Sequence, residues 1–154
     1  MKNKQFLIFN FKFLNKGFTL VEVLVVVAIA AFILSIASVS FREAKARGRD
    51  ARREGDIKQI QNTIDVYHVN RRQFPACSLA VINGSSDCLT QAILGDGITN
   101  FLATDPLHGG SGTCSALGSY VYCYESDGSS YTLYYNLETD TIIGKSAGWH
   151  QAKP

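Results

Sequence analysis

One apolar run stands out along the chain: from Phe18 to Phe41 the sequence contains a single ionisable side chain, that of Glu22. At a rise of about 1.5 Å per residue, a helix of this length spans a hydrocarbon core of roughly 30 Å. A carboxylate inside such a segment is costly and calls for a partner. The pattern therefore predicts a membrane-spanning helix over residues 18–41, with Glu22 as its exceptional position.

A second hydrophobic pattern follows over residues 42–73, without an intervening proline. Its apolar positions are spaced i, i+3, i+7 and i+10, and they are Ile57, Ile60, Ile64 and Tyr67. This spacing predicts one stripe of an amphipathic helix. Phe74-Pro75 marks its end, because the residue before a proline disfavours α geometry. We therefore predict one continuous helix from Phe18 to about Arg72.

The remaining residues, 74–154, form a head with the alternation typical of strands. Residues 120–124 and 131–137 alternate and are separated by an Asp-Gly turn, and a second turn leads into residues 141–143. This arrangement predicts an antiparallel meander. One face of the middle strand is free to cover the amphipathic helix and consists of Tyr131, Leu133, Tyr135 and Leu137. The sequence thus favours an α+β fold, in which a long N-terminal helix packs on a small antiparallel sheet.

The other parts of the head carry weaker signals. Residues 78–118 are rich in Gly, Ser, Asn and Asp and predict loops, with a short helix over residues 89–94 or 98–102. Residues 144–150 are expected to form a surface tail, with Trp149 packed against the head.

Composition adds a domain estimate and a charge balance. With 154 residues, 46 % hydrophobic and 18 % charged, the chain has room for one membrane segment and one small domain. Residues 1–17 contain four lysines and no acid, so without them eleven basic residues face thirteen acids, a net charge near −2. Residues 42–72 carry nine basic and five acidic side chains, a net of +4, and the head carries two lysines and seven acids, a net of −5. These opposite charges favour packing of heads on helices, within a subunit or between neighbours.

The apolar run begins with a compact signature after its basic leader: Gly17, Phe18, Thr19, Leu20, Val21 and Glu22. This stretch resembles the N-terminal processing signature of type IV prepilins and pseudopilins. In that family a membrane peptidase cuts after the glycine and methylates the new first residue. The resemblance implies a leader of residues 1–17, an N-methylated Phe18, and Glu22 as the fifth residue of the processed chain (22 − 17 = 5). A plain signal anchor and a secretory signal peptide are the competing interpretations.

Glu22 gains a partner if the chain is cut after Gly17. A glycine lets a protease approach the backbone closely, and the cut leaves a positive amine on Phe18, near the carboxylate of Glu22. A neighbouring subunit's amine can pair with Glu22 inside a packed bundle, where both charges are compensated. We therefore hypothesise that Glu22 sets the axial register of subunits in a fibre.

All four cysteines lie in the head, and three pairings are possible. Short loops are the easiest to close, which favours the pairs Cys77–Cys88 and Cys114–Cys123. A zinc site is the rival interpretation, but no Cys-x-x-Cys spacing occurs and the three histidines are scattered. Disulfides fit an extracytoplasmic head.

Six basic residues directly after the apolar run oppose that orientation. They outnumber the four lysines that precede the run. The positive-inside rule therefore gives no clear orientation or places the head in the cytoplasm. Two interpretations stay open: a solvated face that contacts lipid headgroups or neighbouring acids, or a DNA-binding stripe along a fibre. The six residues are Arg42, Lys45, Arg47, Arg49, Arg52 and Arg53.

Asp105-Pro106 resembles the Asp-Pro that opens the variable loop of major pseudopilins, some of which bind calcium nearby. Asp105 is therefore a candidate calcium ligand, although no acids at liganding spacing follow it. No other cofactor is expected. The head has no recognisable nucleophile elbow, phosphate loop or paired-carboxylate cleft, so an enzyme is not expected either.

Together with the resemblance, these patterns predict a structural subunit of a type IV pilus or pilus-like fibre. Its precursor would be a single-pass membrane protein with an extracytoplasmic head, and the assembled fibre would be periplasmic or at the cell surface. The implied partners are further copies, minor pilins, a prepilin peptidase, an inner-membrane platform with an assembly ATPase, and membrane lipid before assembly. The alternatives are a pseudopilin of type II secretion, a DNA-uptake fibre, and a membrane-anchored binding module that never polymerises.

Overall fold

The computed structural model describes residues 17–154, so the leader predicted over residues 1–17 lies outside the described residues except for Gly17. The chain forms two compact units, Met1–Ser40 and Phe41–Pro154. Helix α1, Leu20–Arg71, contributes its first half to one unit and its second half to the other. The single long helix predicted from the sequence is confirmed, and its ends differ from the prediction by one or two residues.

The first half of α1 is long and apolar enough to cross a membrane, with a mean hydropathy of 2.9 over its most apolar window. None of that window is buried inside the protein. Large apolar side chains that are at least half exposed along a whole segment mark a surface that contacts lipid or another protein.

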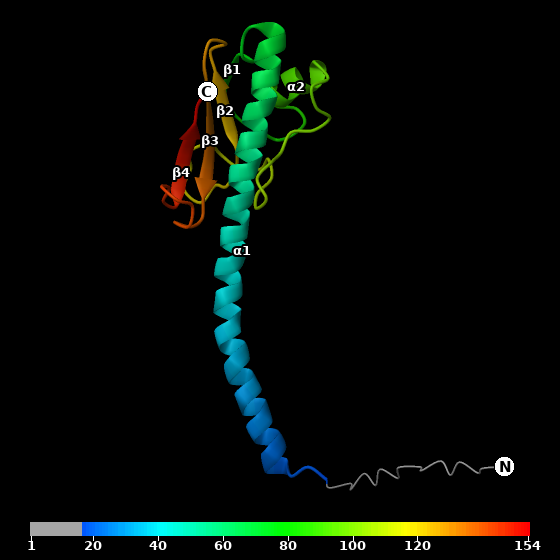
Figure 1. Ribbon diagram of the computed structural model, residues 1–154, viewed down its shortest axis with the longest axis vertical. Helices are drawn as coiled ribbons and strands as arrows, with labels where there is room; N and C mark the ends of the chain where they lie inside the picture. The colour runs from blue at the N-terminus through cyan, green and yellow to red at the C-terminus, as the bar shows by residue number, and fades with distance from the viewer. Residues whose placement is uncertain (1–16) are drawn as a thin grey trace, which may run out of the picture. The chain divides into compact units, whose positions relative to one another are not determined.

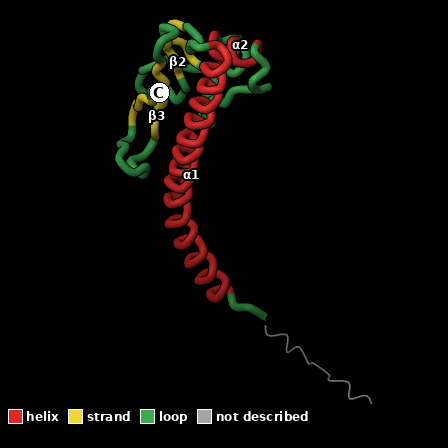
Figure 2. The backbone as a smooth tube through the Cα atoms, turned by 45° about the horizontal axis from the view of Figure 1, so that its top comes forward, coloured by secondary structure: helices red, strands yellow, loops and turns green. Residues whose placement is uncertain are grey.

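The second unit contains a four-stranded antiparallel sheet beside the second half of α1 (Figure 1). Its strands are β1 (Cys77–Val81), β2 (Cys123–Ser126), β3 (Tyr131–Leu137) and β4 (Gly148–Ala152), and they are paired in that order. The remainder of this unit is loop, apart from the short helix α2, Cys88–Gly95 (Figure 2). The α+β fold predicted from the sequence is therefore confirmed.

The core of this unit lies between α1 and the sheet. The predicted helical stripe is buried, because Ile57, Ile60 and Ile64 are at most 2 % exposed. The predicted face of β3 meets the same core through Tyr131, Leu133, Tyr135 and Leu137. Burial of one such side chain is worth about 1.5–3 kcal/mol, so this contact dominates the attachment of the head to the helix.

Two expectations about the sheet are wrong. Residues 141–143 are not a strand: they belong to a loop, in which Lys145 N donates to Ile142 O and Ile143 is fully exposed. The fourth strand is instead β4, in the segment expected to be a tail, where Trp149 pairs with Asn136 of β3. β4 shows no clear alternation of buried and exposed positions, because its ladder rests on backbone pairing to β3.

Two smaller differences concern the first half of the head. Strand β1 was not predicted, and β2 begins at Cys123 rather than at residue 120. The first of the two short-helix candidates corresponds to α2, whereas residues 98–102 are not helical. Asp87 caps α2, since its side chain accepts a hydrogen bond from Thr90 N at 2.9 Å.

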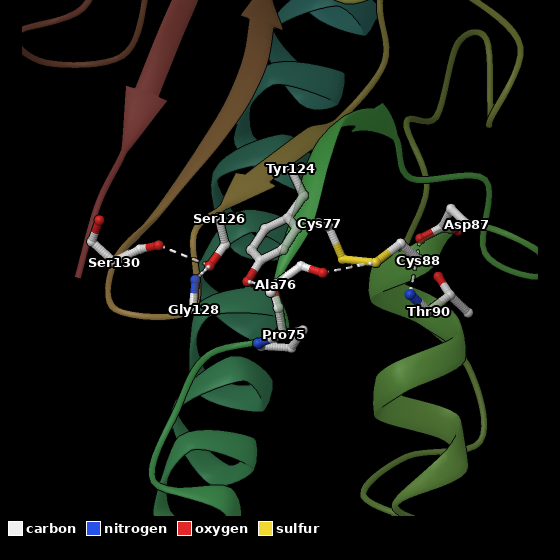
Figure 3. The surroundings of a disulfide bond; sticks show 10 residues. All are labelled: Pro75, Ala76, Cys77, Asp87, Cys88, Thr90, Tyr124, Ser126, Gly128 and Ser130. Carbon is white, nitrogen blue, oxygen red and sulfur yellow. Dashed lines mark hydrogen bonds between the residues drawn. A yellow bond between two sulfur atoms is a disulfide. The ribbon is translucent and has the colours of Figure 1, made fainter.

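Both predicted disulfides are present, Cys77–Cys88 and Cys114–Cys123. Figure 3 shows the first of them joining the start of β1 to the start of α2, beside the Asp87 cap. Each bond closes a short loop, for which about 2–4 kcal/mol of stabilisation is typical. The loops of the head are thus held where the small core alone would hold them weakly.

Candidate functional site

The signature stretch lies at the start of α1. Gly17, Phe18 and Thr19 precede the helix and are not helical. The Phe18 side chain is 80 % exposed. Glu22 lies in the first turn and is also exposed, and among residues 17–154 its carboxylate has no partner. The Gly17–Phe18 peptide bond therefore lies outside the helix and joins two exposed residues.

Gly17 is not required by packing within the described part of the chain. A Cβ atom built on Gly17 would meet no heavy atom within 4 Å. An alanine would fit there, so packing within residues 17–154 does not explain the glycine.

Thr19 begins the helix. Its Oγ1 accepts a hydrogen bond from the backbone N of Glu22 at 3.2 Å, and its carbonyl accepts one from Val23 N at 3.3 Å. Thr19 is thus the N-cap and Glu22 occupies the third helical position, which is the spacing of a capping box. Thr19 was not singled out as a site from the sequence, although Thr-x-x-Glu before an apolar run was the signal that could have found it.

Loss of the Thr19 cap is expected to loosen the first turn of α1. Replacing Thr19 by Val removes the acceptor oxygen and keeps the shape, at a cost of about 1 kcal/mol of helix stability. In the protein reconstituted in lipid nanodiscs, the Glu22 amide should then exchange with solvent roughly five-fold faster.

Thr19→Ser is the matched control, because it keeps the hydroxyl, and it should exchange as the unaltered chain does. Equal exchange in the Val and Ser variants would contradict the role of Thr19 as a cap.

The rest of the first half of α1 is an uncovered apolar surface. Every large apolar side chain in it that the structure describes is at least 50 % exposed. These residues are Leu20, Val21, Val23, Leu24, Val25, Val26, Val27, Ile29, Phe32, Ile33, Leu34 and Ile36, with Phe18 just before the helix and Phe41 directly after this half. Such a surface is unfavourable in water and has to be covered by lipid or by other helices.

A buried cluster of charges ties the second half of α1 to the head. We call it the Arg53 network; it consists of Arg49, Asp50, Arg53, Asp105 and Glu138. Arg53 is 0 % exposed and donates from Nε to Asp105 Oδ2 at 2.6 Å and from Nη2 to Asp105 Oδ1 at 3.1 Å. Its Nη1 donates to Asp50 Oδ1 at 2.8 Å and to Glu138 Oε1 at 2.6 Å. One guanidinium therefore joins the helix to two separate segments of the head.

The other members of the network complete this connection. Asp50 is buried and accepts from the backbone N of Glu138 at 2.9 Å and from Thr139 N at 2.8 Å. Arg49 Nε donates to Glu138 Oε1 at 2.7 Å. The two arginines and three acids leave the cluster near a net charge of −1 (2 − 3 = −1). Every charge has a partner, which a buried ionic group requires.

The charges shift one another's proton affinities. Burial acts to lower the pKa of Arg53, but the hydrogen bonds that it donates to Asp105 and Glu138 outweigh burial, so the pKa is raised. Hydrogen bonds from Arg49 hold the pKa of Glu138 below its ordinary value of 4.5, although burial acts to raise it. Both groups therefore stay ionised at neutral pH.

Acid is expected to weaken the attachment of the head. A carboxyl with a lowered pKa in the folded state stabilises the fold above its unfolded pKa, and this stability is lost as the pH falls through the folded value. The free energy of unfolding should thus decrease as the pH is lowered below about 4.5, the unfolded value for Glu138. Denaturant titrations between about pH 6 and pH 3 measure this dependence.

In the same titrations Glu138→Gln should show a smaller decrease, whereas the exposed control Glu125→Gln should behave as the unaltered protein. An equally steep decrease in Glu138→Gln would show that this carboxyl does not contribute.

The Arg53 network changes the interpretation of two sequence features. Asp105, the candidate calcium ligand, has both carboxylate oxygens bonded to Arg53 and also accepts from Leu107 N at 2.8 Å. Within residues 17–154 no group of three or more His, Cys, Asp or Glu side chains is placed to hold a metal ion. The six-residue basic cluster is partly used by the fold, since Arg49 and Arg53 bind acids of the head.

Two further ionic contacts link α1 to the head. Arg71 Nε donates to Asp96 Oδ2 at 2.8 Å, at the C-terminal end of the helix. Lys145 Nζ donates to Glu54 Oε1 at 2.7 Å, at the helix residue that directly follows Arg53. The opposite charges of helix and head, inferred from the sequence, therefore meet within one subunit.

Comparisons with known proteins agree with the signature and with the fold. The family model described as "Prokaryotic N-terminal methylation motif" matches residues 12–38. The "Type IV major fimbrial protein FimA" of Dichelobacter nodosus is 31 % identical over 108 residues, which cover 70 % of this chain and 67 % of that protein. No solved structure matches the chain.

Proposed function

Because this chain belongs to the type IV pilin family, we propose that it is a structural subunit of a type IV pilus or pilus-like fibre, processed after Gly17 and polymerised through its apolar N-terminal helix. The family and the apolar helix fit a membrane-anchored precursor and a surface fibre. The observation that carries the proposal is the uncovered apolar half of α1, whose one acid lies five residues beyond an exposed glycine.

In this proposal the chain divides into four functional parts. Residues 1–17 are the leader that the peptidase removes. Residues 18–41 hold the precursor in the membrane and later form the fibre interior, residues 42–73 are the amphipathic half of the long helix, and residues 74–154 are the disulfide-bonded head.

Processing creates the charge that assembly uses. Hydrolysis of the Gly17–Phe18 bond consumes one water and leaves a carboxylate on Gly17 and an amine on Phe18. Transfer of a methyl group from a methyl donor to that amine, with loss of one proton, keeps the amine basic. The Thr19 cap fixes where the helix begins, so that the amine lies at the helix N-terminus and Glu22 in its first turn. The amine of one subunit then pairs with the Glu22 carboxylate of the next, and both charges are compensated in a low-dielectric bundle.

The apolar half of α1 has a role both in the membrane-anchored precursor and in the assembled fibre. In the membrane its side chains face lipid, which satisfies them as well as protein does, and its backbone groups are bonded within the helix. In the fibre the same side chains pack against neighbouring helices, so the transfer exchanges one apolar environment for another. Assembly is therefore directed by packing, by charge register and by the assembly machinery.

The proposed partners follow from this route. They are further copies of this chain, minor pilins, a prepilin peptidase, and an inner-membrane platform with its assembly ATPase. Lipid surrounds the precursor before assembly. Partnership with DNA is proposed only if fibres bind it with a steep dependence on salt.

The location of the processed chain tests this proposal. Filaments sheared from cells should contain it, and inactivation of the assembly ATPase should leave it in the membrane fraction. A chain that stays in the membrane of cells with intact machinery would indicate an anchored binding module instead. A chain confined to short periplasmic fibres, and needed for protein export, would indicate a pseudopilin.

A further inference from the structure

The two most exposed large aliphatic side chains of the head lie at one end of it. Leu117 and Ile143 are both fully exposed, unlike the half-exposed apolar residues elsewhere on the head. Ile143 lies in the connection between β3 and β4, residues 138–147, and Leu117 lies in the loop that precedes β2. We call these two segments the loop end of the head.

Contacts place both segments together. Trp149 Nε1 at the start of β4 donates to Ala116 O at 3.1 Å, next to Leu117. Leu117 and Trp149 line one surface hollow together with Leu137 and Ala147. Leu117 and the β3–β4 connection therefore form one surface that carries protruding aliphatic groups.

The loop end lies beside the first turns of the helix in this unit. Glu138 N and Thr139 N both donate to Asp50, whereas the other end of β3 packs Tyr131 against Phe74, beyond the helix C-terminus. Figure 1 shows the β3–β4 connection at the lower end of the sheet. Phe41, the last residue of the apolar run, is eight residues before Arg49, or about 12 Å along a helix.

The charges at this end suit an anionic surface. Residues 41–49 contain four basic side chains and one acid, a net of +3 (4 − 1 = 3). Residues 138–147 add two acids and one lysine, so the two segments together keep a net charge of +2 (3 − 1 = 2). Of the acids, Glu43 binds Arg47, Glu138 binds Arg49 and Arg53, and Asp140 accepts from the backbone N of Ala147. Basic side chains beside protruding aliphatic groups are the combination that binds the interface of anionic bilayers.

We propose that in the membrane-anchored precursor Leu117 and Ile143 insert into the headgroup layer of an anionic bilayer. The headgroup region extends about 5–7 Å beyond the hydrocarbon on each side, and membrane helices tilt by about 20° on average, which brings the loop end within reach. The head then rests on the membrane through its loop end, and extraction into a fibre has to detach it. This proposal rests on the membrane stage of the proposed function.

Single-tryptophan variants test the contact, because Trp149 is the only tryptophan of the chain. In a Trp149→Phe background, Leu117→Trp, Ile143→Trp, Val69→Trp and Phe32→Trp are made one at a time in the full chain. Each is reconstituted in vesicles of phosphatidylglycerol and phosphatidylcholine that carry bromine near the headgroup end of the acyl chain. Val69, 70 % exposed near the C-terminal end of α1, is the matched control far from Phe41.

The expected result is several-fold stronger quenching at positions 117 and 143 than at position 69. The difference should shrink in vesicles of phosphatidylcholine alone and at raised salt. Quenching at 117 and 143 no stronger than at 69, with position 32 strongly quenched, would overturn the proposal and leave the proposed function intact.

Two other outcomes also count against it. Absence of quenching at position 32 would show that the apolar helix does not insert, which refutes the membrane stage of the proposed function. Shielding of 117 and 143 that grows with the protein-to-lipid ratio would assign the loop end to a second copy of the chain in place of lipid.

Discussion

Replacement of Arg53 by Ala is expected to lower the free energy of unfolding by about 3–5 kcal/mol. The guanidinium is fully buried and is the shared partner of Asp50, Asp105 and Glu138. Its removal leaves the buried Asp50 and Asp105 without their cationic partner, and Arg49 alone then faces the acids of the network. The penalty arises from these uncompensated carboxylates more than from the attraction that is lost.

Arg52→Ala is the matched control. Arg52 is the preceding residue, its side chain is 64 % exposed, and its pair with Asp56 at 3.6 Å is open to solvent. Such a pair is worth about 0–1 kcal/mol. Denaturant unfolding of the protein in detergent, followed by Trp149 fluorescence, measures both variants. A difference below about 1 kcal/mol between them would contradict the central place of Arg53.

Glu22→Leu is expected to abolish fibre assembly while the chain is still cleaved and kept in the membrane. The substitution makes the apolar half of α1 more hydrophobic, so insertion should improve. It leaves the amine of each processed subunit without its carboxylate in the fibre interior, and an unpaired charge there costs several kcal/mol. Fibres recovered by shearing, compared with processed chain in the membrane, measure the loss.

Two companion variants separate charge from helix capping. Glu22→Gln keeps a side chain suited to the capping box but removes the charge, so it should fail to assemble as Glu22→Leu does. Val25→Leu changes the volume of the same exposed surface without changing charge, and it should assemble normally. If Glu22→Leu formed normal fibres at the rate of the unaltered chain, the hypothesis that Glu22 sets the register of subunits through its charge would be contradicted.

The elements predicted correctly from the sequence are those with a strong local signal. The long helix rests on an apolar run followed by the spacing of Ile57, Ile60 and Ile64, and β3 rests on strict alternation, so both were predicted nearly to the residue. The disulfide pairs followed from the entropy of closing short loops.

The missed elements depend on partners that are distant in the sequence. β1 becomes a strand because it pairs with β2, more than 40 residues away, and β4 because it pairs with β3. The Arg53 network joins residue 53 to residues 105 and 138. Net charges of helix and head could suggest attraction, but no spacing along the chain identifies which arginine is buried.

The network also explains part of the basic cluster that opposed the predicted orientation. Arg49 and Arg53 are needed to neutralise acids of the head, and Arg47 and Arg52 pair with acids on α1 itself. Of these residues, Arg49 and Arg53 attach the head to the helix. The bias from the positive-inside rule is thus in part a by-product of the attachment of the head.

The N-terminal residue of the mature protein tests the central claim most directly. Intact-mass and tandem mass spectrometry of the chain from its native cells should find a first residue that is Phe18 carrying one methyl group on its amine, with residues 1–17 absent. A chain that still begins at Met1 or Lys2, or one that is cut at another bond, would contradict processing after Gly17 and the register proposed for Glu22.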